Sequence, residues 1–178
     1  LSTALAPLNV TVKAGTPDDI AGSDVVMNTA GIHQSVLDDP AQTFRQNIEL
    51  IRATAERIEQ LCPQAVVITV TNPIDAMNYA TWRATSLERR QFIGYSLNDT
   101  FRFREFVART KGVQLGQVDG LVIGEHGRTQ VQLFSSVRID GRPVPFSEEE
   151  KQAIRDEIPA FFKRNEALKT GRTAGWTC

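Results

Sequence analysis

The 178-residue sequence predicts an α/β fold in which an incomplete parallel sheet is followed by the start of an α+β part. Three observations lead to this fold class. Short apolar runs alternate with amphipathic stretches, which is the rhythm of strand–helix–strand crossover units. The run "AVVITV" is continuous and largely β-branched, as expected for a strand buried on both faces of a parallel sheet. Near the end this rhythm gives way to a hairpin and a long helix.

The composition is that of an ordinary globular protein, with 41% hydrophobic and 23% charged residues. A formal net charge of -1 gives no reason to expect a nucleic acid or an anionic membrane as partner. The two cysteines, Cys62 and Cys178, form no C-x-x-C pair, so we expect neither a disulfide scaffold nor a metal site, and a cytoplasmic location. No membrane span or signal peptide is recognisable, and the first residue, Leu1, indicates a fragment.

The first elements are read from local patterns. Alternating apolar and polar residues predict a half-buried strand over 8–14. Thr16 then caps a helix that has Pro17 in its first turn. The run "SDVVMNTAG" (23–31) predicts a short buried strand that leads into a tight turn, and 32–42 is expected to be a loop.

A long amphipathic helix is predicted next, because apolar residues recur every three or four positions between 41 and 62 and Pro63 ends the pattern. The stretch "AVVITVTNP" (65–73) is the predicted central strand. Asn72 is expected to cap the following helix, with Pro73 at its first position.

The second half continues with a short strand over 91–96 and a helix over 98–112 that ends in glycine. The stretch 131–146 predicts a β-hairpin that turns at its Asp-Gly pair. A long helix over 147–171 begins with a Ser-x-x-Glu capping box, and Pro159 is expected to bend it.

Two short polar motifs, "TAG" (29–31) and "TNP" (71–73), follow consecutive predicted strands. Ligands of open parallel sheets bind at the carboxyl ends of strands. Gly31 would let a ligand approach the backbone, and the Asn72 amide can both donate and accept a hydrogen bond. The alternative is that both motifs contain ordinary turn residues.

A second group combines "NDTFRFR" with "VIGEHGRT". Asp99 and Arg102 share a helix face, either as a surface ion pair or with separate tasks, Asp99 orienting a histidine and Arg102 binding a carboxylate. His126 is either an idle loop residue or an acid/base whose charged form a carboxylate favours. The sequence has no G-x-S-x-G, H-E-x-x-H or P-loop motif. Cys62 is interpreted as a buried structural thiol.

Taken together, "SDVVMNTAG", "TNPIDAM", "IGYSLNDTFRFR" and "VIGEHGRTQVQLFSSV" resemble the lactate/malate dehydrogenases in order and spacing, from about Val10 to Trp176. The resemblance implies a partial Rossmann-type NAD-binding domain over 1–97 and a partial catalytic α+β domain over 98–178. It implies hydride transfer between NAD and a small 2-hydroxy acid, either malate/oxaloacetate or lactate/pyruvate. It also implies a homodimer or homotetramer that packs through the helix at 41–62.

The resemblance further assigns roles to individual residues. His126 would take the hydroxyl proton, Asp99 would be its carboxylate partner, and Arg102 would bind the carboxylate of the substrate. The remaining implied contacts are Asn72 with substrate and cofactor, Gln34 and Thr173 with substrate, and Ala30, Gly31, Asn47 and Val70 with NAD.

Two departures from the family pattern matter. The Gly-rich phosphate turn and the C-terminal end do not occur in this sequence, so we expect weak NAD binding by the chain itself. The loop arginine of the family falls on Pro40, with Arg45 nearby on the helix, and the position that selects the substrate falls on Gln34, which favours a monocarboxylic acid. Pro40 keeps open a catalytically impaired paralogue that retains the fold and subunit contacts. A different NAD-linked chemistry is the other alternative, and it would leave Arg102 unexplained.

Overall fold

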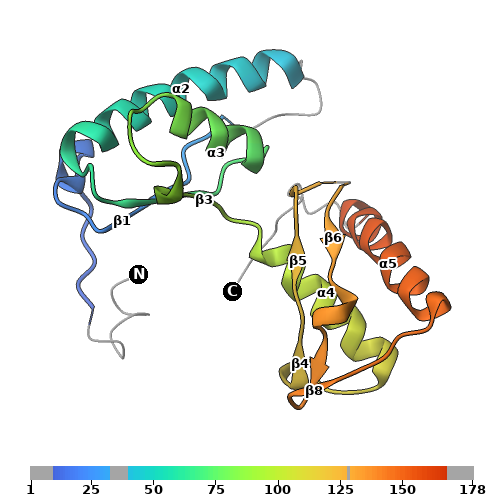
Figure 1. Ribbon diagram of the computed structural model, residues 1–178. Coiled ribbons are helices and arrows are strands. Elements are labelled where there is room, and N and C mark those ends of the chain that lie inside the picture. Colours follow the sequence, from blue (N-terminus) through green and yellow to red (C-terminus); the bar gives the residue numbers. More distant parts are fainter. Residues whose placement is uncertain (1–9, 33–39, 128, 168–178) are drawn as a thin grey trace. The chain divides into compact units, whose positions relative to one another are not determined.

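The chain divides into two compact units, residues 1–95 (unit 1) and 96–178 (unit 2). The computed structural model describes residues 10–32, 40–127 and 129–167 (Figure 1). No helix in this described part combines membrane-spanning length with an apolar sequence.

Unit 1 contains a three-stranded parallel sheet in the order β1-β2-β3, which confirms the predicted α/β class. Its elements are a 3-10 turn η2 (Pro17–Ile20), β1 (Val25–Asn28), α2 (Pro40–Leu61), β2 (Val66–Thr69), α3 (Ile74–Arg83), a 3-10 turn η3 (Arg89–Gln91) and β3 (Phe92–Gly94). Each strand is linked to the next by a crossover that contains a helix, as parallel strands require.

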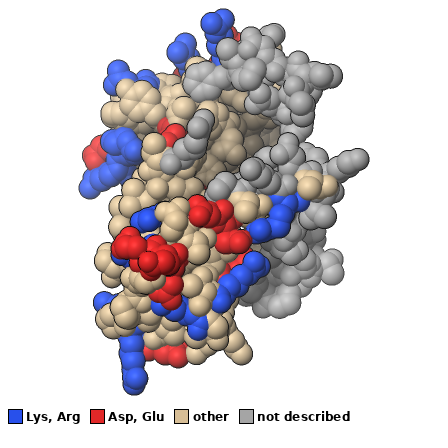
Figure 2. All heavy atoms as spheres, turned by 90° about the vertical axis from the view of Figure 1, so that its right-hand side faces the viewer, with Lys and Arg blue, Asp and Glu red and all other residues tan. Residues whose placement is uncertain are grey.

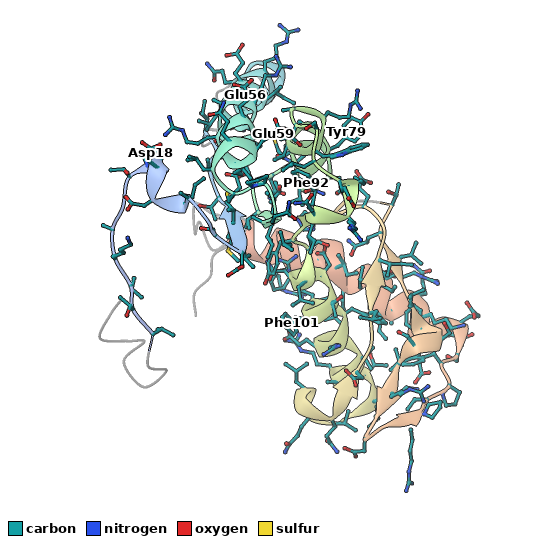
Figure 3. All side chains as sticks on the ribbon, turned by 60° about the vertical axis from the view of Figure 1, so that its left-hand side comes forward. Asp18, Glu56, Glu59, Tyr79, Phe92 and Phe101 are labelled. Atoms are coloured by element: carbon teal, nitrogen blue, oxygen red, sulfur yellow. The ribbon has the colours of Figure 1, made fainter. Side chains whose placement is uncertain are left out.

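Helices α2 and α3 lie on the same side of this sheet (Figure 1). The core between helices and sheet is fully or almost fully buried and consists of Ile51, Ala55, Ile58, Val67, Met77 and Phe92. Burial of each large side chain there contributes about 1.5–3 kcal/mol. The Glu59 carboxylate on α2 accepts hydrogen bonds from the Ser86 backbone (2.8 Å) and hydroxyl (2.5 Å), which ties α2 to the turn after α3 (Figure 3).

The predicted burial of the strands is wrong for one face of the sheet. Val25 and Met27 of β1 are 55% and 60% exposed, and Ile93 of β3 is 47% exposed. In β2 only Val67 and Thr69 are buried. Within the described residues no helix covers the face opposite α2 and α3, so the strands are half-buried although their sequences are continuously apolar.

The expected strand over 8–14 is not found, because residues 10–16 form neither helix nor strand and 8–9 lie outside the described residues. Alternation predicts a strand only if a neighbouring strand is present to pair with it. The helix start at Thr16 is confirmed as a single 3-10 turn, in which the Asp19 carboxylate accepts a hydrogen bond from the Thr16 backbone (2.6 Å).

The predicted cap of α3 is displaced by one residue. Pro73 is the N-cap and Ile74 is the first helical residue, so Asn72 lies outside the helix, on the other side of a cis Asn72–Pro73 peptide bond. An extended Pro73 satisfies the cap geometry without a side-chain hydrogen bond, and the Asn72 side chain is left exposed at the end of β2.

Unit 2 packs two helices and two small antiparallel sheets, β4-β7-β8 and β5-β6. Its elements are α4 (Leu97–Lys111), a 3-10 turn η4 (Leu115–Gln117), β4 (Val118–Asp119), β5 (Val122–Ile123), β6 (Val131–Gln132), a 3-10 turn η5 (Phe134–Ser136), β7 (Arg138–Ile139), β8 (Arg142–Pro143) and α5 (Glu148–Ala167). The core is aromatic at its centre, where Phe103 and Phe134 meet edge-on with ring centroids 5.2 Å apart.

Local signals in unit 2 are largely confirmed. The predicted hairpin turns at Asp140 and Gly141, which have φ angles of 48° and 75°, but it covers only β7 and β8. The expected first arm is interrupted, because Val131–Gln132 pair with β5 instead. Ser147 and Glu150 form the predicted capping box, with a 3.2 Å bond from the Glu150 backbone to the Ser147 hydroxyl. Helix α5 continues through Pro159.

Opposite charges adjoin on the face seen in the space-filling view (Figure 2). Ion pairs in unit 2 include Lys111 with Glu150 and Lys151 with Glu148, each at 2.6 Å. The Lys111–Glu150 pair is partly buried, whereas Glu148 of the second pair is 77% exposed, and exposed pairs contribute little to stability. Their interspersion does, however, prevent a large field of one sign.

Candidate active site

One carboxylate in unit 2 holds both a histidine and an arginine. Asp99 lies in the first turn of α4, and its Oδ2 atom is 2.5 Å from Nδ1 of His126. Its Oδ1 atom accepts a hydrogen bond of 3.0 Å from Nη1 of Arg102. The structure therefore brings together three residues that the sequence singled out, two from one helix and one from the loop between β5 and β6.

The group is shielded from solvent. The side chains of Asp99, Arg102 and His126 are 5%, 13% and 22% exposed. The Arg102 guanidinium also lies over the Phe161 ring, 5.2 Å from its centroid. The expected ion pair of Asp99 and Arg102 is therefore present, but it is buried and not at the surface. Asp99 also contacts His126, so it binds both neighbours. A buried carboxylate needs such partners to remain charged.

Glycines on both sides of Glu125-His126 shape the loop that presents the imidazole. Gly124 has a φ of 91°, a conformation that residues with side chains rarely adopt. The Gly127 backbone donates to the Glu125 carbonyl (2.9 Å), and a Cβ on Gly127 would lie 3.0 Å from the Glu125 carboxyl carbon. The loop therefore turns back on itself immediately after His126.

In unit 1 the two polar motifs meet at the carboxyl ends of β1 and β2. The Thr71 hydroxyl donates to the Ala30 carbonyl (2.6 Å), and the Val70 backbone donates to the Asn28 carbonyl (3.0 Å). A Cβ on Gly31 would lie only 2.5 Å from Cγ2 of Thr71. The neighbouring threonine therefore leaves no room for a side chain at Gly31, a reason for glycine that the sequence reasoning missed.

Two buried asparagines fix the turn after β1. Asn47, on α2, accepts a 2.6 Å bond from the Ile32 backbone, and Asn28 accepts a 3.1 Å bond from the Ala30 backbone. Both side chains are 4% exposed. Within the described residues the Asn28 Nδ2 atom has no hydrogen-bond partner. The sequence signal for Asn28 was a polar residue at the end of an apolar strand.

The remaining predicted site residues are less informative. Gln34 and Thr173 lie outside the described residues. Pro40 is the first residue of α2, and Arg45 lies exposed on that helix. Cys62 is confirmed as buried, 2% exposed, and burial raises the pKa of its thiol.

Comparisons with known proteins point to one family over both units. The family profile "lactate/malate dehydrogenase, NAD binding domain" matches residues 2–94, and "lactate/malate dehydrogenase, alpha/beta C-terminal domain" matches 97–167. An L-lactate dehydrogenase of Pseudothermotoga lettingae is 38% identical over 131 residues, which cover 73% of this chain and 42% of the relative. A malate dehydrogenase of Staphylococcus epidermidis is 35% identical over 128 residues, 71% of this chain and 41% of the relative.

Solved structures of lactate and malate dehydrogenases have the same fold as this chain. A lactate dehydrogenase of Cryptosporidium parvum, complexed with lactic acid and nicotinamide adenine dinucleotide, matches with a TM-score of 0.79 and 30% identity over 95% of this chain and 57% of that one. A malate dehydrogenase of Aeropyrum pernix matches with a TM-score of 0.79 and 28% identity, over 94% of this chain and 56% of that one. The chain spans less than half the length of the Pseudothermotoga lettingae and Staphylococcus epidermidis relatives, 42% and 41% respectively.

Proposed function

The chain belongs to the lactate/malate dehydrogenase family. We propose that it is part of an oxidoreductase that transfers a hydride between NAD and a small 2-hydroxy acid. The observation that carries the proposal is the pairing of His126 with a buried Asp99 that also holds Arg102. This arrangement places a proton acceptor and a carboxylate-binding cation on either side of one anchor.

The protein's part in the reaction is to move one proton and to hold the substrate. NAD, when bound, supplies the hydride acceptor for oxidation and the hydride donor for the reverse reaction. During oxidation the hydrogen on the substrate carbon leaves with its bonding electron pair, the C=O bond forms, and His126 takes the hydroxyl proton at Nε2. Asp99 holds Nδ1 and stabilises the imidazolium that results. In the reverse direction His126 returns the proton to the new hydroxyl.

Arg102 is proposed to bind the carboxylate of the substrate with its planar fork. Its Nη1 atom donates to Asp99, which fixes the plane of the guanidinium relative to the imidazole. The same carboxylate therefore sets the orientation of both groups that the substrate meets, and so reduces the entropy lost on reaching the reactive geometry.

We propose that residues 1–97 provide part of the NAD site and 98–178 the catalytic part. Ala30, Gly31, Asn47, Val70 and Asn72 would hold the cofactor. The chemistry of the strand ends fits this role, since an exposed Asn72 amide and the short Ala30–Gly31 turn lie where open parallel sheets bind nucleotides.

The proposed substrate is a monocarboxylic 2-hydroxy acid, lactate in preference to malate, because Gln34, at the family position that selects the substrate, carries no charge to bind a second carboxylate. Thr173 is proposed to lie beside the substrate. Assembly is proposed to be a homodimer or homotetramer that packs through α2, whose Leu50 is 38% exposed.

The test is NADH oxidation by the complete protein with pyruvate, oxaloacetate and a bulkier 2-oxo acid. His126→Asn and Asp99→Asn should each lower kcat by about 10²–10⁴-fold. Glu105→Gln, which alters an exposed carboxylate two turns along the same helix, is the matched control and should leave kcat unchanged. Loss of turnover in the first two variants alone supports the proposal.

A second candidate is a paralogue that keeps the fold and the subunit contacts without catalysis. Pro40 favours it, because proline offers no charge where the family polarises the substrate carbonyl, and one missing donor typically costs about 10²–10³ in rate. Binding of NADH with no turnover of any of the three acids would establish this candidate and refute the dehydrogenase.

A further inference from the structure

Helix α4, which carries Asp99, also forms hydrogen bonds to the backbone segment that leads to His126. The Thr100 hydroxyl accepts a hydrogen bond of 3.1 Å from the backbone N–H of Val122. One turn further along α4, Nε of Arg104 donates to the Gly120 carbonyl at 3.0 Å, and its Nη2 atom lies 3.1 Å from the Asp119 carboxylate. Helix α4 therefore holds the backbone at residues 120 and 122 at two points.

The contact between α4 and this segment is close, and Thr100 is shielded from solvent there. Thr100 is 3% exposed. A Cβ on Gly120 would lie 3.2 Å from the Phe103 ring and 3.4 Å from Val137, so the strand lies against the helix with no space between them. Strand β5 has only two residues and pairs with β6. Its neighbour Leu121 also donates to the Ser136 hydroxyl (3.2 Å) and accepts from the Leu133 backbone (2.9 Å), and the bond to Thr100 is the hydrogen bond that ties β5 to the helix of Asp99.

The two ends of the His126–Asp99 hydrogen bond are linked through Thr100. Asp99 precedes Thr100 on the helix, and Val122 precedes His126 by four residues of a strand and tight turn. A change in the bond between Thr100 and Val122 therefore moves the loop relative to the carboxylate.

We propose that Thr100 is a positioning residue of this site: its hydroxyl holds β5 so that the His126 imidazole stays aligned with Asp99. The consequence for catalysis rests on the proposed function, but the alignment itself does not. Valine at this position would fill the same space and leave the Val122 N–H without its acceptor, so the strand would shift to satisfy that donor.

The state of the imidazole gives a readout that does not depend on turnover. The charged groups described near the ring are Asp99 and Arg102 on α4 and Glu125 in its own loop, and Glu125 accepts a hydrogen bond from the Thr129 hydroxyl. Asp99 contacts the ring at Nδ1. The titration midpoint of His126 therefore reports how well this pair is aligned, because a nearby carboxylate favours the charged imidazole.

The experiment is an NMR titration of the His126 ring in the complete protein, with its resonance assigned by its loss in His126→Asn. Thr100→Val removes the hydroxyl at nearly constant shape, and Thr100→Ser retains it. Thr81→Val is the matched control, since Thr81 is also a fully buried helical threonine that hydrogen-bonds to backbone, 2.7 Å from the Met77 carbonyl in unit 1. The kcat and KM values of each variant are measured in parallel.

Thr100→Val should move the midpoint away from that of the parent, toward the value of an unpaired imidazole, and lower kcat about tenfold, with KM within about twofold. Thr100→Ser and Thr81→Val should behave as the parent. An unchanged midpoint in folded Thr100→Val overturns the proposal. If that variant does not fold, Thr100→Ala, which also removes the hydroxyl, is judged by the same criterion. A midpoint that differs between the parent and Thr100→Val, in a protein without turnover, refutes the proposed function and supports the positioning role.

Discussion

The contact between Gly31 and Thr71 predicts a specific packing defect in Gly31→Ala. The new methyl group would lie 2.5 Å from Cγ2 of Thr71. The backbone at Gly31 is outside the positive-φ region, so alanine meets no conformational penalty there. Thr71 cannot rotate away without losing its 2.6 Å hydrogen bond to the Ala30 carbonyl. The clash is therefore the dominant effect of the substitution.

The magnitude follows from the distances. Carbon atoms pack at about 3.5–4.0 Å, so one of the two methyl groups must move by about 1 Å. Overpacking of this kind costs about 1–3 kcal/mol, and loss of the hydrogen bond would add about 1 kcal/mol. The smaller entropy of the unfolded alanine variant returns about 0.4–1 kcal/mol. We expect a net loss of about 1–3 kcal/mol in the free energy of unfolding.

A second substitution isolates the cause. Thr71→Ser removes Cγ2 and keeps the hydroxyl, after which the nearest remaining atoms of residue 71 lie 3.5 and 3.6 Å from the new methyl group, which is ordinary contact. Urea unfolding followed by circular dichroism should show Gly31→Ala to be costly alone and close to neutral in the Thr71→Ser background. Gly116→Ala, with no heavy atom within 4 Å of its Cβ, is the control. An equal cost in both backgrounds would refute the packing argument.

Three further predictions concern other parts of the chain. The hydrogen bond from Lys111 holds the pKa of Glu150 below its usual value, so the ionised Glu150 stabilises the fold fully above about pH 4.5, and this stabilisation is lost as pH falls through the lowered pKa. The melting temperatures of the parent and Glu150→Gln should therefore converge between about pH 5 and pH 3. A constant gap between the two melting temperatures would contradict this. Burial shields the Cys62 thiol and raises its pKa. In a Cys178→Ser background, a thiol reagent at neutral pH should therefore label the native protein at least about 10³-fold more slowly than the unfolded protein. Rapid labelling of the native protein would show that the thiol is accessible. Gly112 closes α4 with a φ of 66°, so Gly112→Ala should lower the free energy of unfolding in urea by about 1–2 kcal/mol and Gly112→Asn by less; equal losses would argue against a conformational origin.

Local patterns were sufficient to predict most elements of the fold. Strand β2, helices α2 and α4, and the turn at Asp140–Gly141 depend on periodicity, caps and positive φ, all of which are written in neighbouring residues. The exposure of Val25 and Met27 and the missing strand over 8–14 depend instead on which other segments pack against them. No pattern within a segment contains that information.

The candidate site shows the same division. The pairing of His126 with Asp99 was expected from the resemblance, and the structure brings the two residues into contact. The simultaneous hold of Asp99 on Arg102, and the bonds made by Thr71 and Thr100, were not expected. Each of these bonds needs the register between segments distant in sequence, and a threonine that makes such a bond looks in sequence like one that does not.

The sequence separation of paired strands predicts the order in which the two units fold. In unit 1 Val25 pairs with Val66, which closes a loop of about 40 residues, whereas in unit 2 Arg138 pairs with Pro143 across a loop about eight times shorter. Three doublings of loop length raise the entropic cost of closure by about 2 kcal/mol. Contacts between residues that are close in sequence form faster. We therefore expect unit 2, with its hairpin and capped helices, to form contacts first, and the parallel sheet of unit 1 to form more slowly, with its apolar strands exposed to aggregation until then.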